Sequence, residues 1–306
     1  MSDIAALNDE YGIAQRVVFY AGNGGLPFAE LLNDQSRAVI ALQGGQLLSW
    51  APQDGNEVIW LSPDADFVPG KSIRGGIPIC WPWFGPHPRE DSFPAHGFAR
   101  TTPWQVLASE ATSDAATGLT LRLAQGDIAR KFWPYSSELL LRVRLGAELE
   151  LELVTRNTGA VPIIISEALH TYFNVGDVRE IAIHGLGDCQ YLDKVDGYAR
   201  KRQTGPVTFG GETDRIYVDT ADDCLIDDPG LSRRIFISKL GSCSTVVWNP
   251  WVEKAAKMGD LGGDGYLKMV CVESGNAADN RISIAPGAEH RLTVIYRLEA
   301  LVAQKP

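Results

Sequence analysis

The chain has 306 residues, of which 45% are hydrophobic and 22% are charged, and its formal net charge at pH 7 is -10. This composition is sufficient for a sizeable core and argues against a chain that is disordered throughout. The acidic balance argues against nucleic acid as a partner, because phosphate backbones favour basic surfaces. A small anion can still bind to such a protein where arginines converge in a pocket.

The start of the chain and its cysteines predict the compartment. Met1 to Ala5 form neither a basic nor an apolar region, so no secretory signal is predicted, and no apolar run reaches membrane-spanning length. The five cysteines, at 80, 189, 224, 243 and 271, are scattered without CxxC spacing. They predict neither a zinc site nor a disulfide framework. We therefore expect a cytoplasmic protein without a membrane partner.

Short β-strands are predicted along most of the chain, because apolar and polar residues alternate with a period of two. The clearest case is the stretch 138–154, where the apolar residues fall on odd positions and Gly146 predicts a turn between two antiparallel strands. In chain order, strands are expected at 15–20, 28–33, 37–42, 57–61, 104–110, 118–124, 138–154, 162–168, 180–184, 214–218, 233–239, 244–248, 268–273 and 291–298. One short helix is expected through residues 253–257. Many short strands at regular spacing predict one all-β domain, a β-sandwich over residues 1–306.

Residues 74–86 (RGGIPICWPWFGP) and 96–100 (HGFAR) form a segment rich in glycine, proline and aromatic residues. Glycine and proline both oppose a long helix, so this segment predicts a stiff pocket lining. Arg74, Arg100 and His96 place cationic donors in it, which suits an anionic ligand with an apolar face beside it. A phosphorylated sugar has this chemistry. The alternative interpretation is that these two arginines are ordinary charged residues of the protein surface.

His170 and Glu273 each follow an apolar strand, at a place where catalytic groups often lie on a rigid scaffold. The alternatives are a hydrogen-bonded loop histidine and a solvated glutamate at a strand end. Asp214, after a glycine turn, is a substrate contact or a turn-capping residue. The sequence contains no HxH, HExxH or comparable metal-ligand spacing, and no metal is predicted.

Five motifs in order resemble the aldose 1-epimerase superfamily and, within it, the hexose-6-phosphate mutarotases, also called glucose-6-phosphate 1-epimerases. These motifs are RGGIPICWPWFGPH at 74–87, AHGFAR at 95–100, SEALHTYF at 166–173, TDRIY at 213–217 and VCVESGN at 270–276. The resemblance implies a galactose-mutarotase-like β-sandwich (a supersandwich) with few short helices. It also implies an isomerase that needs no metal or organic cofactor. Ala95 is a departure, since some relatives have a polar side chain there.

Residue by residue, the resemblance implies His170 and Glu273 as catalytic residues and Arg74, His96, Arg100 and Asp214 as substrate-binding residues. Interconversion of anomers requires a base for the proton of the C1 hydroxyl and an acid for the ring oxygen. We expect Glu273 to be the base. His170 would be the acid, which requires a pKa above its ordinary value of about 6.5.

The two arginines are expected to bind the phosphate, and His96 and Asp214 to hold ring hydroxyls or orient the reacting groups. The expected partner is therefore a small hexose 6-phosphate, bound by a monomer. Two alternatives stay open: a mutarotase for neutral aldoses, and a non-catalytic carbohydrate-binding β-sandwich.

Overall fold

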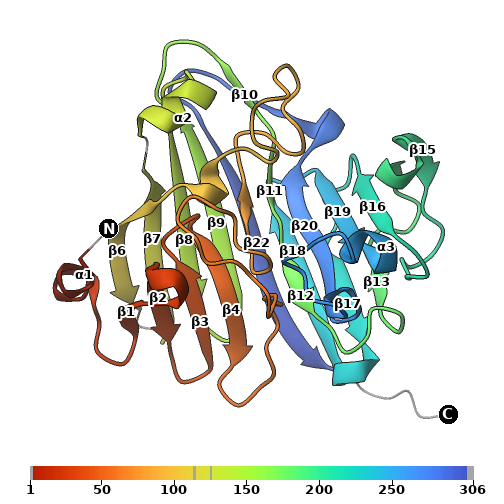
Figure 1. Ribbon diagram of the computed structural model, residues 1–306, viewed down its shortest axis with the longest axis horizontal. Coiled ribbons are helices and arrows are strands. Elements are labelled where there is room, and N and C mark those ends of the chain that lie inside the picture. Colours follow the sequence, from red (N-terminus) through yellow and green to blue (C-terminus); the bar gives the residue numbers. More distant parts are fainter. Residues whose placement is uncertain (1–2, 113–114, 125, 302–306) are drawn as a thin grey trace.

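The computed structural model describes residues 3–112, 115–124 and 126–301, and this part of the chain is built mainly of antiparallel strands in two layers (Figure 1). The first layer is an eight-stranded sheet in the order β13-β17-β18-β22-β9-β8-β7-β6. Its strands are β6 (Trp104–Ala111), β7 (Thr117–Leu123), β8 (Ser137–Leu145), β9 (Leu149–Asn157), β13 (Ala182–His184), β17 (Cys224–Asp228), β18 (Arg233–Leu240) and β22 (Glu289–Ala300).

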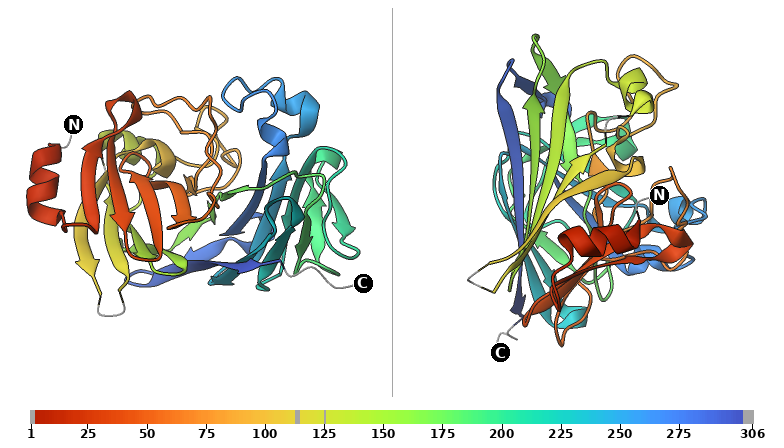
Figure 2. Two further views of the ribbon diagram at one scale, coloured as in Figure 1. Left: turned by 90° about the horizontal axis from the view of Figure 1, so that it is seen from below. Right: turned by 90° about the vertical axis from the view of Figure 1, so that its left-hand side faces the viewer.

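Two further sheets form the second layer, which Figures 1 and 2 show on one face of the first. One is four-stranded: β1 (Val17–Ala21), β2 (Pro27–Leu32), β3 (Ser36–Ala41) and β4 (Gln46–Pro52). The other has the order β15-β14-β16-β19-β20-β11-β5, and β12 also pairs with β20. Its strands are β5 (Ile79–Cys80), β11 (Glu167–Leu169), β12 (Tyr172–Asn174), β14 (Gln190–Asp193), β15 (Ala199–Arg202), β16 (Thr213–Tyr217), β19 (Ser244–Asn249) and β20 (Met269–Asn276).

The remaining elements are short. A two-stranded ribbon joins β10 (Ile163–Ile165) to β21 (Ile282–Ile284). The α-helices are α1 (Ile4–Tyr11), α2 (Asp127–Phe132) and α3 (Trp251–Ala255). Single 3-10 turns are η1 (Asn23–Gly25), η2 (Ala99–Thr101), η3 (Lys194–Asp196), η4 (Pro229–Leu231), η5 (Gly265–Leu267) and η6 (Ala278–Asn280). Within the described ranges, no helix is both long and apolar enough to cross a membrane.

Tyr296 of β22, in the first layer, packs against both sheets of the second layer. Its fully buried ring lies 6.4 Å from Trp50 of β4 and 5.3 Å from Phe173 of β12, measured between ring centroids. Its hydroxyl lies 2.6 Å from the Thr171 hydroxyl. Large aromatic rings bury much apolar surface, so this contact stabilises the packing of both sheets on β22.

The all-β prediction is confirmed, and the hairpin predicted around Gly146 is present as β8 and β9, with Leu145 paired to Leu149. Leucine, glutamate and arginine favour helices. The alternation of apolar and polar residues nevertheless favours strands here, because it gives each strand one buried face.

The strand predicted at 57–61 is wrong. This segment makes only single bridges, Ile59 with Phe173 and Leu61 with Gly75. Val58, Ile59 and Trp60 are buried in succession, so the apolar run reflects burial on all sides and not membership of a sheet. The strand predicted at 162–168 is interrupted at Ser166, because β10 pairs with β21 while β11 pairs with β20 and β5.

The predicted helix is present as α3, two residues earlier than expected, whereas α1 and α2 were not predicted. The sequence interpretation also missed strands β4, β5, β12, β14, β15, β17 and β21. Most of these are four residues or shorter, which is too short for a period of two to stand out.

Gly97 allows the 96–100 segment to contact the Trp81 backbone. Its φ is +72°, and a Cβ atom there would lie 1.9 Å from the Trp81 carbonyl oxygen. Gly25 has a similar φ of +71° but has open space around it.

We expect Gly97→Ala to lower the free energy of unfolding by clearly more than Gly25→Ala. The left-handed backbone alone costs alanine roughly 1–2 kcal/mol, and only Gly97→Ala adds the clash with Trp81. Urea unfolding of both variants measures the difference. Equal losses at the two positions would contradict the close approach.

Candidate active site

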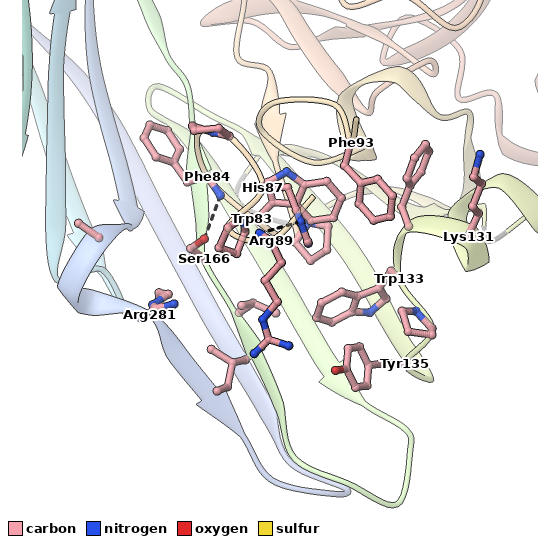
Figure 3. Close-up of a pocket in the computed structure, with 18 of the residues that line it drawn as sticks. Trp83, Phe84, His87, Arg89, Phe93, Lys131, Trp133, Tyr135, Ser166 and Arg281 are labelled. Atoms are coloured by element: carbon pink, nitrogen blue, oxygen red, sulfur yellow. Dashed lines mark hydrogen bonds between the residues drawn. The ribbon is translucent and has the colours of Figure 1, made fainter. Parts of the chain in front are cut away.

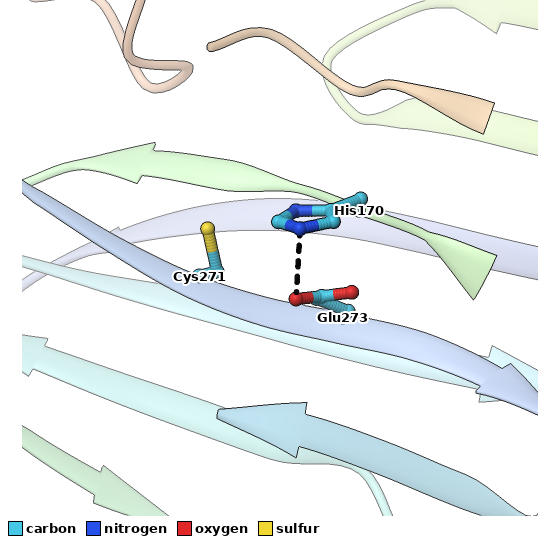
Figure 4. Close-up of side chains that lie close together, drawn as sticks. All are labelled: His170, Cys271 and Glu273. Carbon is cyan, nitrogen blue, oxygen red and sulfur yellow. Dashed lines mark ion pairs between the residues drawn. The ribbon is translucent and has the colours of Figure 1, made fainter. Parts of the chain in front are cut away.

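His170 and Glu273 face each other because β11 and β12 both pair with β20. Leu169 lies opposite Ser274 and Tyr172 lies opposite Cys271, so this register sets His170 opposite Glu273. The His170 Nε2 atom is 3.4 Å from Glu273 Oε1 (Figure 4). Their side chains are 11% and 1% exposed. The pair therefore lies at the bottom of the site with one edge of the imidazole open to ligand.

Residues 170–173 form an extended segment, in which successive side chains point to opposite faces. Thr171 and Phe173 point to Tyr296 in the core, whereas His170 and Tyr172 lie on the other face. The Tyr172 ring stacks on the imidazole at 4.9 Å and 12°, and Trp248 meets it edge-on at 6.0 Å. These two aromatic rings hold the plane of His170 in place.

Burial favours the uncharged forms of both members of the pair. It raises the pKa of Glu273 well above its ordinary value, and the nearby Asp214 carboxylate adds to this rise. Glu273 Oε2 is buried without a hydrogen-bond partner among the described residues, which leaves a carboxylate poorly stabilised.

The pKa of His170 is lowered well below its ordinary value, first by burial and then by electrostatic interaction with the neighbouring His96, Arg100 and Arg74 side chains. An imidazolium would also need an acceptor for Nδ1–H, and this buried atom has none among the described residues. The expectation of a raised His170 pKa is therefore wrong for the free protein. Desolvation, which the sequence does not show, is the reason.

His96 is held as a neutral hydrogen-bonding group. Burial, followed by the charges of Arg100, Lys194 and Arg74, lowers its pKa to about 3. The Gly85 N–H donates to His96 Nδ1 at 3.4 Å, and the His96 N–H donates to the Gly85 carbonyl at 2.7 Å. Since Nδ1 accepts, Nε2 carries the proton and can donate to a ligand oxygen.

All six residues predicted for the site line one cavity of about 370 Å³. They come from five separate parts of the chain, and the cavity contains further polar and aromatic side chains. These are Ser72, Phe84, Tyr172, Lys194, Trp248, Lys254 and Asp260.

The cations of the cavity differ in how they are paired. Arg74 donates from Nε to Asp260 at 3.1 Å and from Nη1 to the Tyr172 hydroxyl at 3.0 Å. Lys194 Nζ lies 2.8 Å from Asp214 Oδ2. Arg100 donates to the Ala95 carbonyl at 2.9 Å and forms no ion pair with any described residue. Its charge is therefore the one most available to an anionic ligand, and the backbone of Ala95 orients it.

Several of these residues were missed from the sequence, although two of them left a signal. Tyr172 lies two positions from His170 in an extended segment, so alternation alone places it on the same face. Trp248 ends a predicted strand. Lys194 begins the 3-10 turn η3 and Asp260 lies in a turn, neither belongs to a sequence pattern, and only the fold brings them to the cavity.

Cys271 lies beside the catalytic candidates, and its sulfur lies within 4.8 Å of ligand atoms of His170 and Glu273 (Figure 4). Thiolate, imidazole and carboxylate are ligand types that zinc binds. Burial raises the pKa of the Cys271 thiol well above its ordinary value, and the same is true of Glu273. Burial thus disfavours the thiolate and the carboxylate, which are the forms that bind a metal, and we assign no metal to these groups.

Comparison with known proteins places the chain in a family. Residues 28–297 match the family model described as aldose 1-epimerase. A protein of Escherichia coli K12, provisionally named glucose-6-phosphate 1-epimerase, is 40% identical over 81% of this chain and 82% of its own length. A protein of Cenchrus ciliaris with the same provisional name is 37% identical, over 87% of this chain and 86% of its own.

The fold agrees with that match. The crystal structure of a protein from Salmonella typhimurium, provisionally described as a mutarotase, superposes with a TM-score of 0.88 at 34% identity, covering 95% of this chain and 96% of that one. A galactose mutarotase related enzyme from Lactobacillus acidophilus shares the fold at a TM-score of 0.71 and 15% identity, covering 90% and 99% of the two chains. The chain belongs to the aldose 1-epimerase family, and its fold is the galactose-mutarotase-like β-sandwich expected from the resemblance.

The lowered pKa values predict the charge state of two histidines. At pH 6.5 the His170 ring should give the nitrogen chemical shifts of a neutral imidazole, and it should begin to change only well below that pH. His96 should titrate near pH 3 if the fold persists there. Histidine-ring 15N NMR with His170→Asn and His96→Asn for assignment measures both. A His170 midpoint at or above 6.5 would contradict its burial as the controlling effect.

Proposed function

We propose that this chain is a glucose-6-phosphate 1-epimerase, a hexose-6-phosphate mutarotase that interconverts the α and β anomers of aldohexose 6-phosphates. The observation that carries the proposal is the facing pair of His170 and Glu273 at the bottom of a cavity edged by Arg74 and Arg100. An acid–base pair suits ring opening, and the cations suit the phosphate. The names of the relatives from Escherichia coli and Cenchrus ciliaris support the same substrate.

In the proposed mechanism, Glu273 accepts the proton of the C1 hydroxyl while His170 donates a proton to the ring oxygen. The bond between C1 and the ring oxygen breaks, and C1 becomes an aldehyde carbon. Rotation about C1–C2 presents the other face of the aldehyde. The C5 hydroxyl then attacks this face, returns its proton to His170, and the new C1 oxygen recovers a proton from Glu273.

The pair needs one proton in total for this reaction. Burial favours the arrangement in which that one proton is on the Glu273 carboxyl group and His170 is neutral. A shift of the proton across the 3.4 Å contact gives the reactive form with a carboxylate and an imidazolium. Proton uptake from solvent is not required, so the titration belongs to the pair and not to either residue alone.

The other polar residues divide into phosphate and hydroxyl contacts. Arg100 and Arg74 bind the phosphate, with Arg100 dominant because it forms no ion pair with a described residue. His96 donates from Nε2 to a sugar oxygen, and Asp214 accepts from a hydroxyl beside Lys194. We also propose that the protein is cytoplasmic and that it acts as a monomer, because the acid–base pair and the cations of the proposed site already meet within a single chain. Light scattering of the purified chain tests the monomer.

Loss of either member of the pair should nearly abolish catalysis. We expect His170→Asn and Glu273→Gln each to lower kcat by about 10²–10⁴, the usual contribution of a positioned acid or base. NMR exchange spectroscopy of glucose 6-phosphate measures the rate. His184→Asn and Glu148→Gln, which change an exposed histidine and an exposed glutamate elsewhere, are matched controls. Retention of most activity in either site variant would refute the assignment.

Arg100 should discriminate the phosphorylated sugar from the free sugar. A hydrogen bond to a charged group contributes roughly 1.5–3 kcal/mol. Arg100→Ala should therefore lower kcat/KM for glucose 6-phosphate by about 10- to 150-fold, with little change for glucose. Lys71→Ala, which removes an exposed charge outside the cavity, is the control.

The same assay separates the alternatives. Equal acceleration of glucose and glucose 6-phosphate, unchanged in Arg100→Ala, would identify a mutarotase for neutral aldoses. Binding of the sugar phosphate without acceleration would identify a carbohydrate-binding protein.

A further inference from the structure

A second and larger cavity, of about 810 Å³, shares Phe84 with the proposed active site. Figure 3 shows the side chains that line it. Phe84 lines both cavities, and its ring meets His96 edge-on at 4.8 Å. Its backbone N–H donates to Ser166 Oγ at 2.9 Å. The walls come from the 82–93 loop, the segment 131–135 at the end of α2, the start of β10, and the turn at 278–281. The proposed mechanism uses none of these walls apart from Phe84.

The cavity is built from aromatic rings. Trp83 and Phe93 lie 6.0 Å apart and Trp133 and Tyr135 lie 4.7 Å apart, between ring centroids. Tyr135 is 41% exposed, so part of its ring is available to a ligand. Figure 3 shows the Trp133 and Tyr135 rings together on one side of the cavity. Flat, partly exposed rings of this kind stack on planar ligands.

The described charged residues that line the cavity are all basic. They are Arg89, Lys131 and Arg281, and the described lining includes no aspartate or glutamate. None of the three cations forms an ion pair within the ranges that the structure describes. In a chain with a net charge of -10, such a set favours an anionic ligand. Figure 3 shows the Arg89 side chain extending along the cavity, between Arg281 and the Tyr135 ring in this view.

The hydrogen-bonding groups argue against a second sugar. A sugar needs acceptors for its hydroxyl groups, and the proposed active site offers the carboxylates of Asp214, Asp260 and Glu273. Among the described residues, the lining of the second cavity has no aspartate, glutamate, asparagine or glutamine. Its indole N–H groups are also already used, by the Pro94 carbonyl for Trp83 and by Ser137 Oγ for Trp133. The chemistry of the cavity therefore suits an aromatic ring that carries a negative charge.

We propose that this cavity is a second ligand site that binds a nucleotide, with the base against Trp133 and Tyr135 and the phosphate on Arg89 and Arg281. A base stacked on an aromatic side chain and a phosphate on a guanidinium are both contacts of substantial strength. The cavity volume lies in the range usual for small-molecule sites. The proposal does not depend on the proposed function, because the two cavities share only Phe84.

Isothermal titration of the full chain with AMP tests the site, with adenosine, inorganic phosphate and glucose 6-phosphate as the comparison ligands. AMP should bind at least about tenfold more tightly than adenosine or phosphate, because it alone makes both kinds of contact. Saturating glucose 6-phosphate should not displace it. Arg89→Ala and Tyr135→Ala should each weaken AMP binding about tenfold or more, while Lys71→Ala leaves it unchanged.

The catalytic activity of these two variants also shows whether they are folded. Arg89 and Tyr135 do not line the proposed active site, so both variants should interconvert the anomers at the rate of the unsubstituted chain. AMP affinity equal to that of inorganic phosphate would overturn the proposal, and so would affinity unchanged in both variants. Displacement of AMP by glucose 6-phosphate would place the nucleotide in the other cavity and would equally overturn it.

Discussion

The pairing of β20 with both β11 and β12 is the constraint on which the site depends. β20 is buried along its whole length, and its ladder sets His170 opposite Glu273. At the far end of the β11 ladder, Glu167 Oε1 accepts from Asn276 at 3.3 Å and lies 2.9 Å from His290 Nε2. These contacts join β11, β20 and β22 and oppose a slip of the register. A slip of one residue would turn either side chain to the other face.

Burial of this pair controls its electrostatics. A histidine and a glutamate in water would form a weak ion pair, but desolvation here favours the neutral forms of both. The surrounding cations do not simply cancel this effect. Arg100 and Lys194 favour the carboxylate of Glu273, whereas Arg100 and Arg74 disfavour the imidazolium of His170. His170 and Glu273 therefore both have an altered affinity for the proton that they share. This suits a reaction that takes one proton and returns it.

The two cavities that share Phe84 differ in the groups that they present. The smaller one combines cations with carboxylates, which suits a ligand with both hydroxyl groups and a negative charge. The larger one combines cations with aromatic rings, and its described lining has no carboxylates. Because Phe84 contacts His96 directly, a ligand in the larger cavity would be separated by one side chain from His96. The smaller cavity, which is the proposed active site, is the one expected from the family fold.

The sequence by itself determined the fold class, and it predicted six residues that the structure brings to one cavity. The period-two alternation identified most of the longer strands, including β8 and β9, and the ordered motifs identified the family that the comparisons then showed. Each of the five motifs contains at least one residue that lines this cavity, such as His170 in SEALHTYF.

Only the tertiary structure decided how those residues act together. The apolar run at 58–60 resembled a strand because it is buried on all sides, and β12 is too short to be recognised as a strand from its pattern. Lys194 and Asp260 reach the cavity from segments without a sequence pattern. The direction of the His170 pKa shift was also beyond the sequence, because it depends on desolvation and on charges contributed by distant segments. Residue identity sets which proton transfers are available, but burial and register, which are properties of the folded chain, set where the proton resides.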